Sequence, residues 1–269
     1  MTDRDRTPRG RADKSRRGDR RGSTSHEGRT AAQERYDGPP IPGDVTGKEL
    51  DRYVTNQLKS LPEKLAARVS RHLVAAAQLL DSDPETAYQH TVAARARAAR
   101  VAVVREASGE AAYAAEKFKD ALAEFKAARR MSGSPLYLPM MADCERALGR
   151  PERALAVAKE KGVDQLDEAG RIELQIVEAG ARRDLGDIAA ALRTLDGPQL
   201  RSQTRSASAA RLRYAYADTL LADGQVEPAR EWFERAAGAD SEGSTDAVDR
   251  VAALTGNRDS EDAPSTGEG

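Results

Sequence analysis

Histidine and cysteine are the side chains best suited to metal binding or nucleophilic chemistry, and this chain has only four of them. The histidines are His26, His72 and His90, and the one cysteine is Cys144. No histidine has a cysteine or carboxylate at the spacing that metal ligands show, and a metal site needs several converging donors. We therefore expect ordinary surface or interhelical histidines, with no metal and no cofactor.

Cys144 has Asp143 and Glu145 on either side and Met140 and Met141 one turn before it. Acidic neighbours raise the pKa of a thiol, and no histidine is near in sequence to activate it. A buried small hydrophobic side chain is therefore favoured over a nucleophile. The glycines follow helices singly and do not form phosphate-binding loops. With no catalytic motif left, the sequence predicts a protein that is not an enzyme.

Four arginines in one stretch raise the possibility of a nucleic-acid surface: Arg95, Arg97, Arg100 and Arg105. At 100° per residue, their side chains scatter around the helix and form no stripe. A solvated face with salt bridges between helices is the favoured interpretation.

The elements that carry these residues are predicted to be helical. The 269 residues include 49 alanines, 32% charged residues and only 4% aromatic residues. A β-sandwich or barrel would need more β-branched and aromatic side chains. The longest apolar run, 136–142, is interrupted by Pro139 and far shorter than the roughly 18 residues of a membrane span. We expect an all-α chain of about twelve helices, with no strand and no contact with a membrane.

Charge divides the chain into three segments. Residues 1–43 carry 11 Lys or Arg against 7 Asp or Glu and almost no apolar side chains, which predicts a disordered basic tail. Residues 44–256 have a net charge of −2 and form the predicted helical body, and residues 257–269 form a short acidic tail of net charge −3, also expected to be disordered. A single cysteine and an N-terminus without an apolar leader favour a cytoplasmic location.

A repeat of small residues gives the clearest architectural signal. Successive helix pairs place an alanine early in the second helix at intervals of 34, 33, 37 and 38 residues, and a further small residue lies twelve positions earlier. Antiparallel helices that approach to about 8–10 Å need small side chains where they cross. The five alanines are Ala87, Ala121, Ala154, Ala191 and Ala229, and their earlier partners are Ala75, Gly109, Ala142, Ala179 and Ala217.

This spacing resembles the tetratricopeptide repeat, a 34-residue helix–turn–helix unit. The last pair matches best, and the third and fourth depart from the pattern at Lys161 and Pro198. The basic head and the turn at 145–154 are also similar to those of an actinobacterial group of tetratricopeptide proteins. The resemblance implies an α-solenoid of about five degenerate repeats, with one or two extra helices at 47–80 and a short closing helix at 244–255.

The resemblance also implies a groove lined by the first helix of each pair. Some family members bind the carboxylates at the C-terminus of a peptide with Lys and Asn. At the matching positions this chain has His72, Glu106 and Glu110 instead, which disfavours such a ligand. The leading hypothesis is a non-catalytic scaffold that holds a segment of an unidentified protein, and the plain alternative is a solvated helix face. The predicted groove residues are Glu106, Tyr113, Asp143, Arg146, Arg183, Tyr214 and Asp218.

A nucleic-acid-associated protein is the alternative function. Its basic tail would contact RNA or DNA phosphates weakly and without sequence preference, because no aromatic residue precedes Tyr36 for base stacking. A helical repeat that reads RNA bases directly is disfavoured by the charge of the body and its irregular spacing. The candidate phosphate contacts are Arg9, Arg11, Lys14, Arg16, Arg17, Arg20 and Arg21.

The tail hypothesis predicts a strong salt dependence. If about five phosphates of a single strand are neutralised, log K should fall with log salt with a slope of roughly −3.5. Fluorescence anisotropy with labelled RNA compares the full chain with residues 44–269. A solubilising tail without a ligand predicts identical curves for the two proteins across the salt series, which would contradict nucleic-acid binding.

Overall fold

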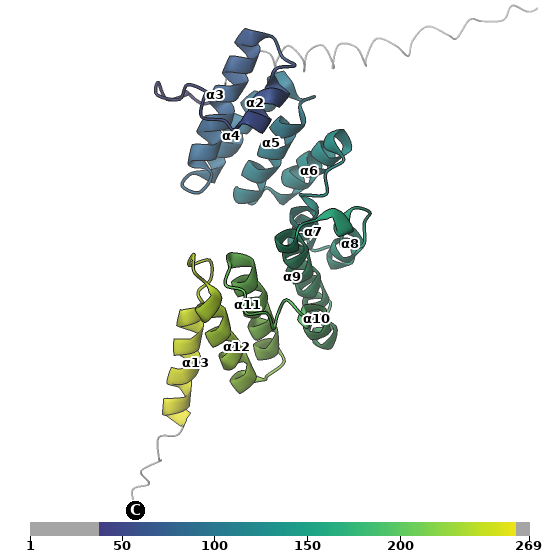
Figure 1. The fold of residues 1–269 in the computed structure, drawn as a ribbon, viewed down its shortest axis with the longest axis vertical. Helices are drawn as coiled ribbons and strands as arrows, with labels where there is room; N and C mark the ends of the chain where they lie inside the picture. Colours follow the sequence, from purple (N-terminus) through teal and green to yellow (C-terminus); the bar gives the residue numbers. More distant parts are fainter. Residues whose placement is uncertain (1–37, 262–269) are drawn as a thin grey trace, which may run out of the picture.

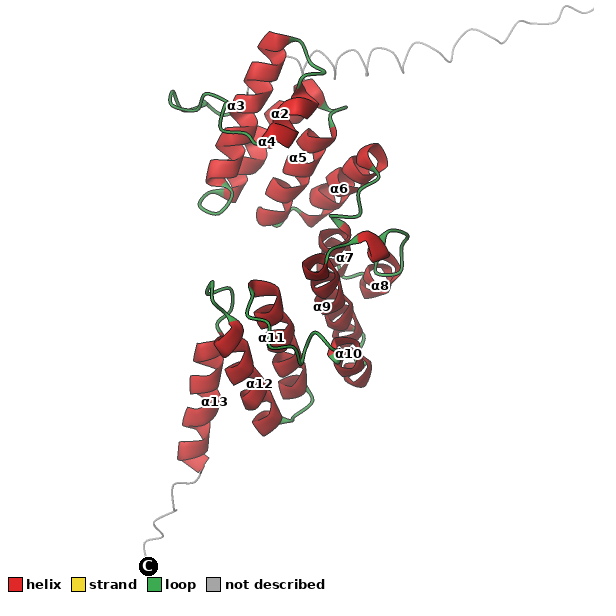
Figure 2. Cartoon of the chain, viewed as in Figure 1, coloured by secondary structure: helices red, strands yellow, loops and turns green. Residues whose placement is uncertain are grey.

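The computed structural model describes residues 38–261, and this part of the chain holds twelve α-helices, one short 3-10 helix (Val163–Gln165) and no strand (Figures 1 and 2). The all-α prediction is therefore confirmed. The helices are α2 (Arg52–Leu58), α3 (Glu63–Leu79), α4 (Pro84–Ala98), α5 (Ala102–Ala114), α6 (Phe118–Ser132), α7 (Leu138–Ala147), α8 (Pro151–Val157), α9 (Glu168–Asp184), α10 (Ile188–Leu195), α11 (Ala207–Ala222), α12 (Val226–Ala239) and α13 (Ala247–Glu261).

Ten of these helices form five consecutive antiparallel hairpins, from α3/α4 to α11/α12, with α2 before them and α13 after them. The hairpins follow one another along an arc (Figure 1). In that view α7 and α9 lie on the inner side of the arc, and α8 and α10 lie on its outer side. The repeat predicted from the sequence is therefore a series of stacked hairpins.

The small residues of the repeat are buried in both helices of each hairpin, as a close helix crossing requires. All five predicted alanines are completely buried, and their partners twelve residues earlier are buried as well. Gly109 shows how close the approach is, because a Cβ atom there would lie 2.5 Å from the ring of Phe125. That ring continues the core into the next hairpin, since it stacks on Tyr137 with 4.7 Å between ring centroids.

The third and fourth hairpins are irregular because their second helices are short. Helix α8 has 7 residues and α10 has 8, and each is followed by a long connection to the next hairpin. Both connections are fixed to the core by a leucine, Leu166 in the first and Leu200 in the second, each almost fully buried. The longer intervals of 37 and 38 residues therefore reflect extended connections that still pack.

The predicted segment boundaries need two corrections. Packing begins before residue 44, because Arg71 donates a hydrogen bond to the carbonyl of Pro42 and Gly38 lies against Ala93. The closing helix begins at 247, because Asp240 accepts the backbone N–H groups of residues 244 and 245 and holds a turn there. It continues to Glu261, into the segment expected to be an acidic tail. Residues 1–37 and 262–269 lie outside the described part of the chain.

Interhelical ion pairs account for two of the clustered arginines. Arg95 of α4 and Arg105 of α5 both contact the carboxylate of Glu124 on α6, with an Arg105 Nη1–Glu124 Oε2 distance of 2.7 Å. Glu124 is only 4% exposed, so the two guanidinium groups compensate for the burial of its charge. The predicted salt-bridging role is thus confirmed for Arg95 and Arg105.

Two histidines form a buried pair inside the first hairpin. The Nδ1 atoms of His72 on α3 and His90 on α4 are 3.0 Å apart, and both side chains are almost fully buried. A hydrogen bond at this distance requires that only one of the two Nδ1 atoms carries a proton. Burial lowers the pKa of both histidines, and that of His72 falls to about 4 because His90, Arg68, Arg97 and Arg71 also oppose its protonation.

This pair predicts a loss of stability in acid. Because the pKa of His72 is lower in the folded chain than its ordinary value of 6.5, the unfolded chain binds protons first. Neutral His72 makes its full contribution to the free energy of unfolding above pH 6.5. This contribution should decline as the pH falls toward 4, by up to about 3 kcal/mol. Urea unfolding across this range measures the effect. The double variant His72→Gln/His90→Gln should lack this component, and equal pH slopes for the two proteins would contradict the assignment.

The alanine register predicts which substitutions the fold cannot accept. Ala121→Glu and Ala229→Glu each bury an unpaired carboxylate at a helix crossing and should cost about 3 kcal/mol or more. The exposed Lys119→Glu on α6 is the matched control and should change stability by less than about 0.5 kcal/mol. Thermal unfolding followed by circular dichroism compares the three variants. Equal melting temperatures would disprove the register.

Candidate functional site

Hydrogen bonds connect the predicted groove residues of α5 and α7 to each other and to α9 in the next hairpin. The Tyr113 hydroxyl on α5 donates to Asp143 Oδ2 on α7 at 2.5 Å. One turn further along α7, Arg146 Nε donates to Asp184 Oδ2 at the end of α9 at 2.6 Å, and its Nη1 lies 3.4 Å from Asp143 Oδ1. Arg146 is therefore one cation between two carboxylates.

The same pattern continues through α9, α11 and α13. Arg183 Nη1 on α9 lies 2.7 Å from Asp218 Oδ2 on α11, and Arg250 Nη2 on α13 lies 2.8 Å from the other oxygen of the same carboxylate. Here one carboxylate lies between two cations. We call the side of the arc formed by these linked residues of α5, α7, α9, α11 and α13 the inner face.

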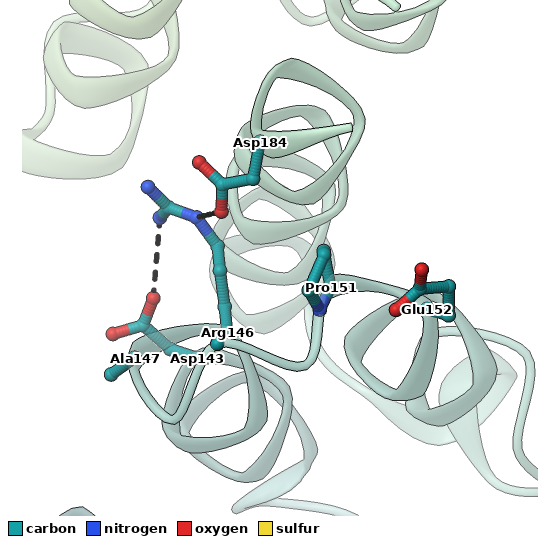
Figure 3. Close-up of a pocket in the computed structure, with 7 residues that line it drawn as sticks. Asp143, Arg146, Ala147, Pro151, Glu152 and Asp184 are labelled. Atoms are coloured by element: carbon teal, nitrogen blue, oxygen red, sulfur yellow. Dashed lines mark hydrogen bonds and ion pairs between the residues drawn. The ribbon is translucent and has the colours of Figure 1, made fainter. Parts of the chain in front are cut away.

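A depression of about 630 Å³ opens on the inner face between α7, α8 and α9 (Figure 3). In Figure 3 the Arg146 side chain extends from α7 towards Asp184, and Glu152 lies across the depression on α8. The guanidinium group rests on the backbone of α9, because a Cβ atom at Gly180 would come within 2.8 Å of its Cζ atom. The side chains of Arg146 and Asp184 are 37% and 38% exposed, so a ligand can reach both.

The inner face is most acidic on α5. Glu106 and Glu110 lie one turn apart, and Glu110 accepts a 2.6 Å hydrogen bond from the hydroxyl of Tyr137. Burial raises the pKa of both carboxyl groups, and the charge of Glu110 raises that of Glu106 further. A cation placed beside them would stabilise their ionised forms.

The two tyrosines of the predicted groove belong largely to the packing between helices. Tyr113 lies edge-on to Phe118, with 5.7 Å between ring centroids, and Tyr214 lies edge-on to Phe233 at 5.1 Å. Burial and a hydrogen bond to Asp246 raise the pKa of Tyr214 to about 12. Their hydroxyl groups reach the inner face, while each ring packs the two helices of its own hairpin together.

Sequence mapping missed three residues of this network, Asp184, Arg250 and Asp246. A signal for the first two was present, because Arg146/Asp184 and Asp218/Arg250 are opposite charges separated by 38 and 32 residues, close to the repeat interval. Charge pairs at the repeat distance therefore mark contacts between neighbouring hairpins. The pairing of Asp246 with Tyr214 has no comparable signal.

The structure also locates two other residues that the sequence singled out, His72 and Cys144. His72 was mapped to the groove, but that position is wrong, because the side chain is buried against His90 between α3 and α4. Cys144 is fully buried as predicted, and burial together with Asp143 and Glu145 raises the pKa of its thiol to about 12. The candidate phosphate contacts at 9–21 lie outside the described residues.

Metal and membrane sites were searched for in the described part of the chain. Across residues 38–261, no three side chains of metal-ligating type come together. Over the same residues, every helix is too short or too polar to cross a bilayer.

Comparison with known proteins adds no functional assignment. The tetratricopeptide resemblance remains a prediction drawn from the spacing of small residues. No protein-family model matches this chain, and the search of curated proteins finds no match either.

Proposed function

We propose that the chain is a non-catalytic scaffold that holds a segment of another protein along its inner face. The observation that carries this proposal is the row of partly exposed charged groups contributed by successive first helices, with an open depression at its centre. Rigid stacked hairpins present such groups at fixed spacing, which suits an extended or helical peptide.

The charge of the inner face favours a basic segment. Towards α5, Arg146 contacts the carboxylates of Asp143 and Asp184. Two further acidic side chains, Glu106 and Glu110, lie on α5 itself. Towards α13, carboxylates and guanidinium groups are balanced, because Arg183 and Arg250 stand against Asp218 and Asp246. A ligand with Lys or Arg side chains facing α5–α9 would complement this distribution.

Binding would compete with contacts that the face already makes. A basic side chain that approaches Asp184 must share this carboxylate with Arg146, so the net gain per contact is smaller than for a free carboxylate. The affinity would therefore be modest and would weaken with salt. Specificity would come from matching several positions along the arc at once.

Site-specific photo-crosslinking tests the location of the ligand. A photoreactive residue at exposed Ala147, at the edge of the depression on α7, should form adducts with a partner protein in a cell extract. The same residue at exposed Ala189 on the outer helix α10 is the matched control and should form at least about tenfold fewer, because affinity resides in contacts at the interface. Equal adduct yields at the two positions would exclude the inner face.

Gly180→Ala tests the inner face independently, because it removes no charged side chain. Its new methyl group must displace the flexible end of Arg146, while alanine within α9 should leave stability unchanged or raise it by about 1 kcal/mol. Adduct formation at Ala147 should decrease although the protein stays folded. Unchanged adduct formation would mean that the position of Arg146 does not matter for binding.

A further inference from the structure

A second depression, of about 560 Å³, lies at the last hairpin, between the connection before α11, α11 itself and the later part of α12. Its wall includes four arginines, Arg201 and Arg205 from the connection before α11, Arg213 from α11 and Arg235 from α12. The chain's only tryptophan, Trp232, lies in the same wall. We call this depression the arginine pocket, and it shares no lining residue with the depression on the inner face.

Arg213 fixes the floor of the arginine pocket. Arg213 is only 7% exposed. Its side chain donates hydrogen bonds to the backbone carbonyls of Leu200, Ser202 and Thr204. These bonds hold the connection against α11. Burial and the nearby charge of Arg235 lower the pKa of Arg213. The charged form of this side chain is therefore electrostatically disfavoured at this position.

Arg235 is exposed, and an aromatic side chain positions its guanidinium group. Its guanidinium group lies over the ring of Trp232, with 4.4 Å from Cζ to the centroid, and Tyr216 supports that ring edge-on at 5.1 Å. A guanidinium group stacked in this way keeps its N–H groups at the edge of the plane, where they can form paired hydrogen bonds to an oxyanion.

The cations of the arginine pocket lack matching carboxylates. Arg201 forms an ion pair with Asp196, which balances its charge. Among residues 38–255, no ion pair joins a carboxylate to Arg205, Arg213 or Arg235. Three positive charges therefore line one open depression, and an anion that entered it would reduce the repulsion between them.

We infer that the arginine pocket is a binding site for the phosphoryl group of a small phosphorylated ligand. Three uncompensated guanidinium groups suit a multiply charged oxyanion better than a single carboxylate, and arginine matches phosphate oxygens in both spacing and geometry. The volume falls in the range of small-molecule sites, about 300–1,000 Å³. This site is separate from the inner face, so it does not depend on the function proposed above.

Trp232 reports directly on this site because no other tryptophan contributes fluorescence. The full chain is titrated with inorganic pyrophosphate, ADP and O-phosphoserine, each against sodium chloride at equal ionic strength. At least one probe should change the emission saturably, with a Kd of about 1 mM or below, and should raise the melting temperature. The strongest probe shows whether the phosphoryl group belongs to a nucleotide or to a modified side chain. No saturable change with any of the three probes would overturn the inference.

Two pairs of variants separate specific binding from general attraction. Gly238 on α12 lines the pocket, and a Cβ atom there would meet nothing within 4 Å. Gly238→Glu therefore adds a negative charge without a clash at Cβ. Gly238→Ala is its control. Arg205→Gln removes one lining cation, and Arg230→Gln removes a cation on α12 that pairs with Glu227 outside the pocket.

Gly238→Glu and Arg205→Gln should weaken probe binding by about tenfold or more, while both controls should stay within about twofold of the wild type. Melting temperatures without the probe verify that all four variants are folded. Equal affinities in the variants and their controls would show that the probes bind elsewhere and would overturn the inference.

Discussion

Close approach of two helix backbones at small residues is the constraint on which the rest of this structure depends. In each hairpin a fully buried alanine of the second helix accompanies a buried small residue of the first, and at Gly109 even one methyl group would clash with Phe125. Short distances between backbones bring the larger side chains beside each crossing into contact. The aromatic rings can then bridge to the next hairpin, as Phe125 does with Tyr137.

The contacts between hairpins use charge as well as apolar packing. Glu124 is buried with two arginines from different helices, and Asp218 receives one arginine from α9 and one from α13. Exposed pairs of this kind add little to stability, whereas a buried carboxylate that lost its partners would be costly. Such pairs therefore specify how one hairpin sits on the next more than they strengthen the stack. On the inner face they also fix the positions of charged groups that remain within reach of a ligand.

Two arginine-rich regions of the chain have opposite physical characters. Around Glu124, two guanidinium groups share one buried carboxylate, and the cluster joins three helices. In the arginine pocket, the hydrogen bonds of Arg213 within the described residues go to backbone carbonyls, while Arg235 lies on Trp232. The first arrangement needs nothing more, and the second leaves positive charge facing an open space. Composition alone would treat the two regions alike.

The sequence by itself determined the helical class and the register of the hairpins, because the spacing of small residues such as Ala121 and Ala229 is a local property that any close helix crossing requires. The resemblance to the tetratricopeptide repeat also indicated Asp143, Arg146, Arg183 and Asp218, because it implies a groove lined by the first helix of each pair. Only the tertiary structure decided that His72 faces His90 in the core and that Arg146 reaches Asp184. The same holds for the assembly of four arginines around Trp232. These pairings join different helices, and their geometry depends on how α8, α10 and the connections after them place one hairpin against the next, which no local pattern encodes.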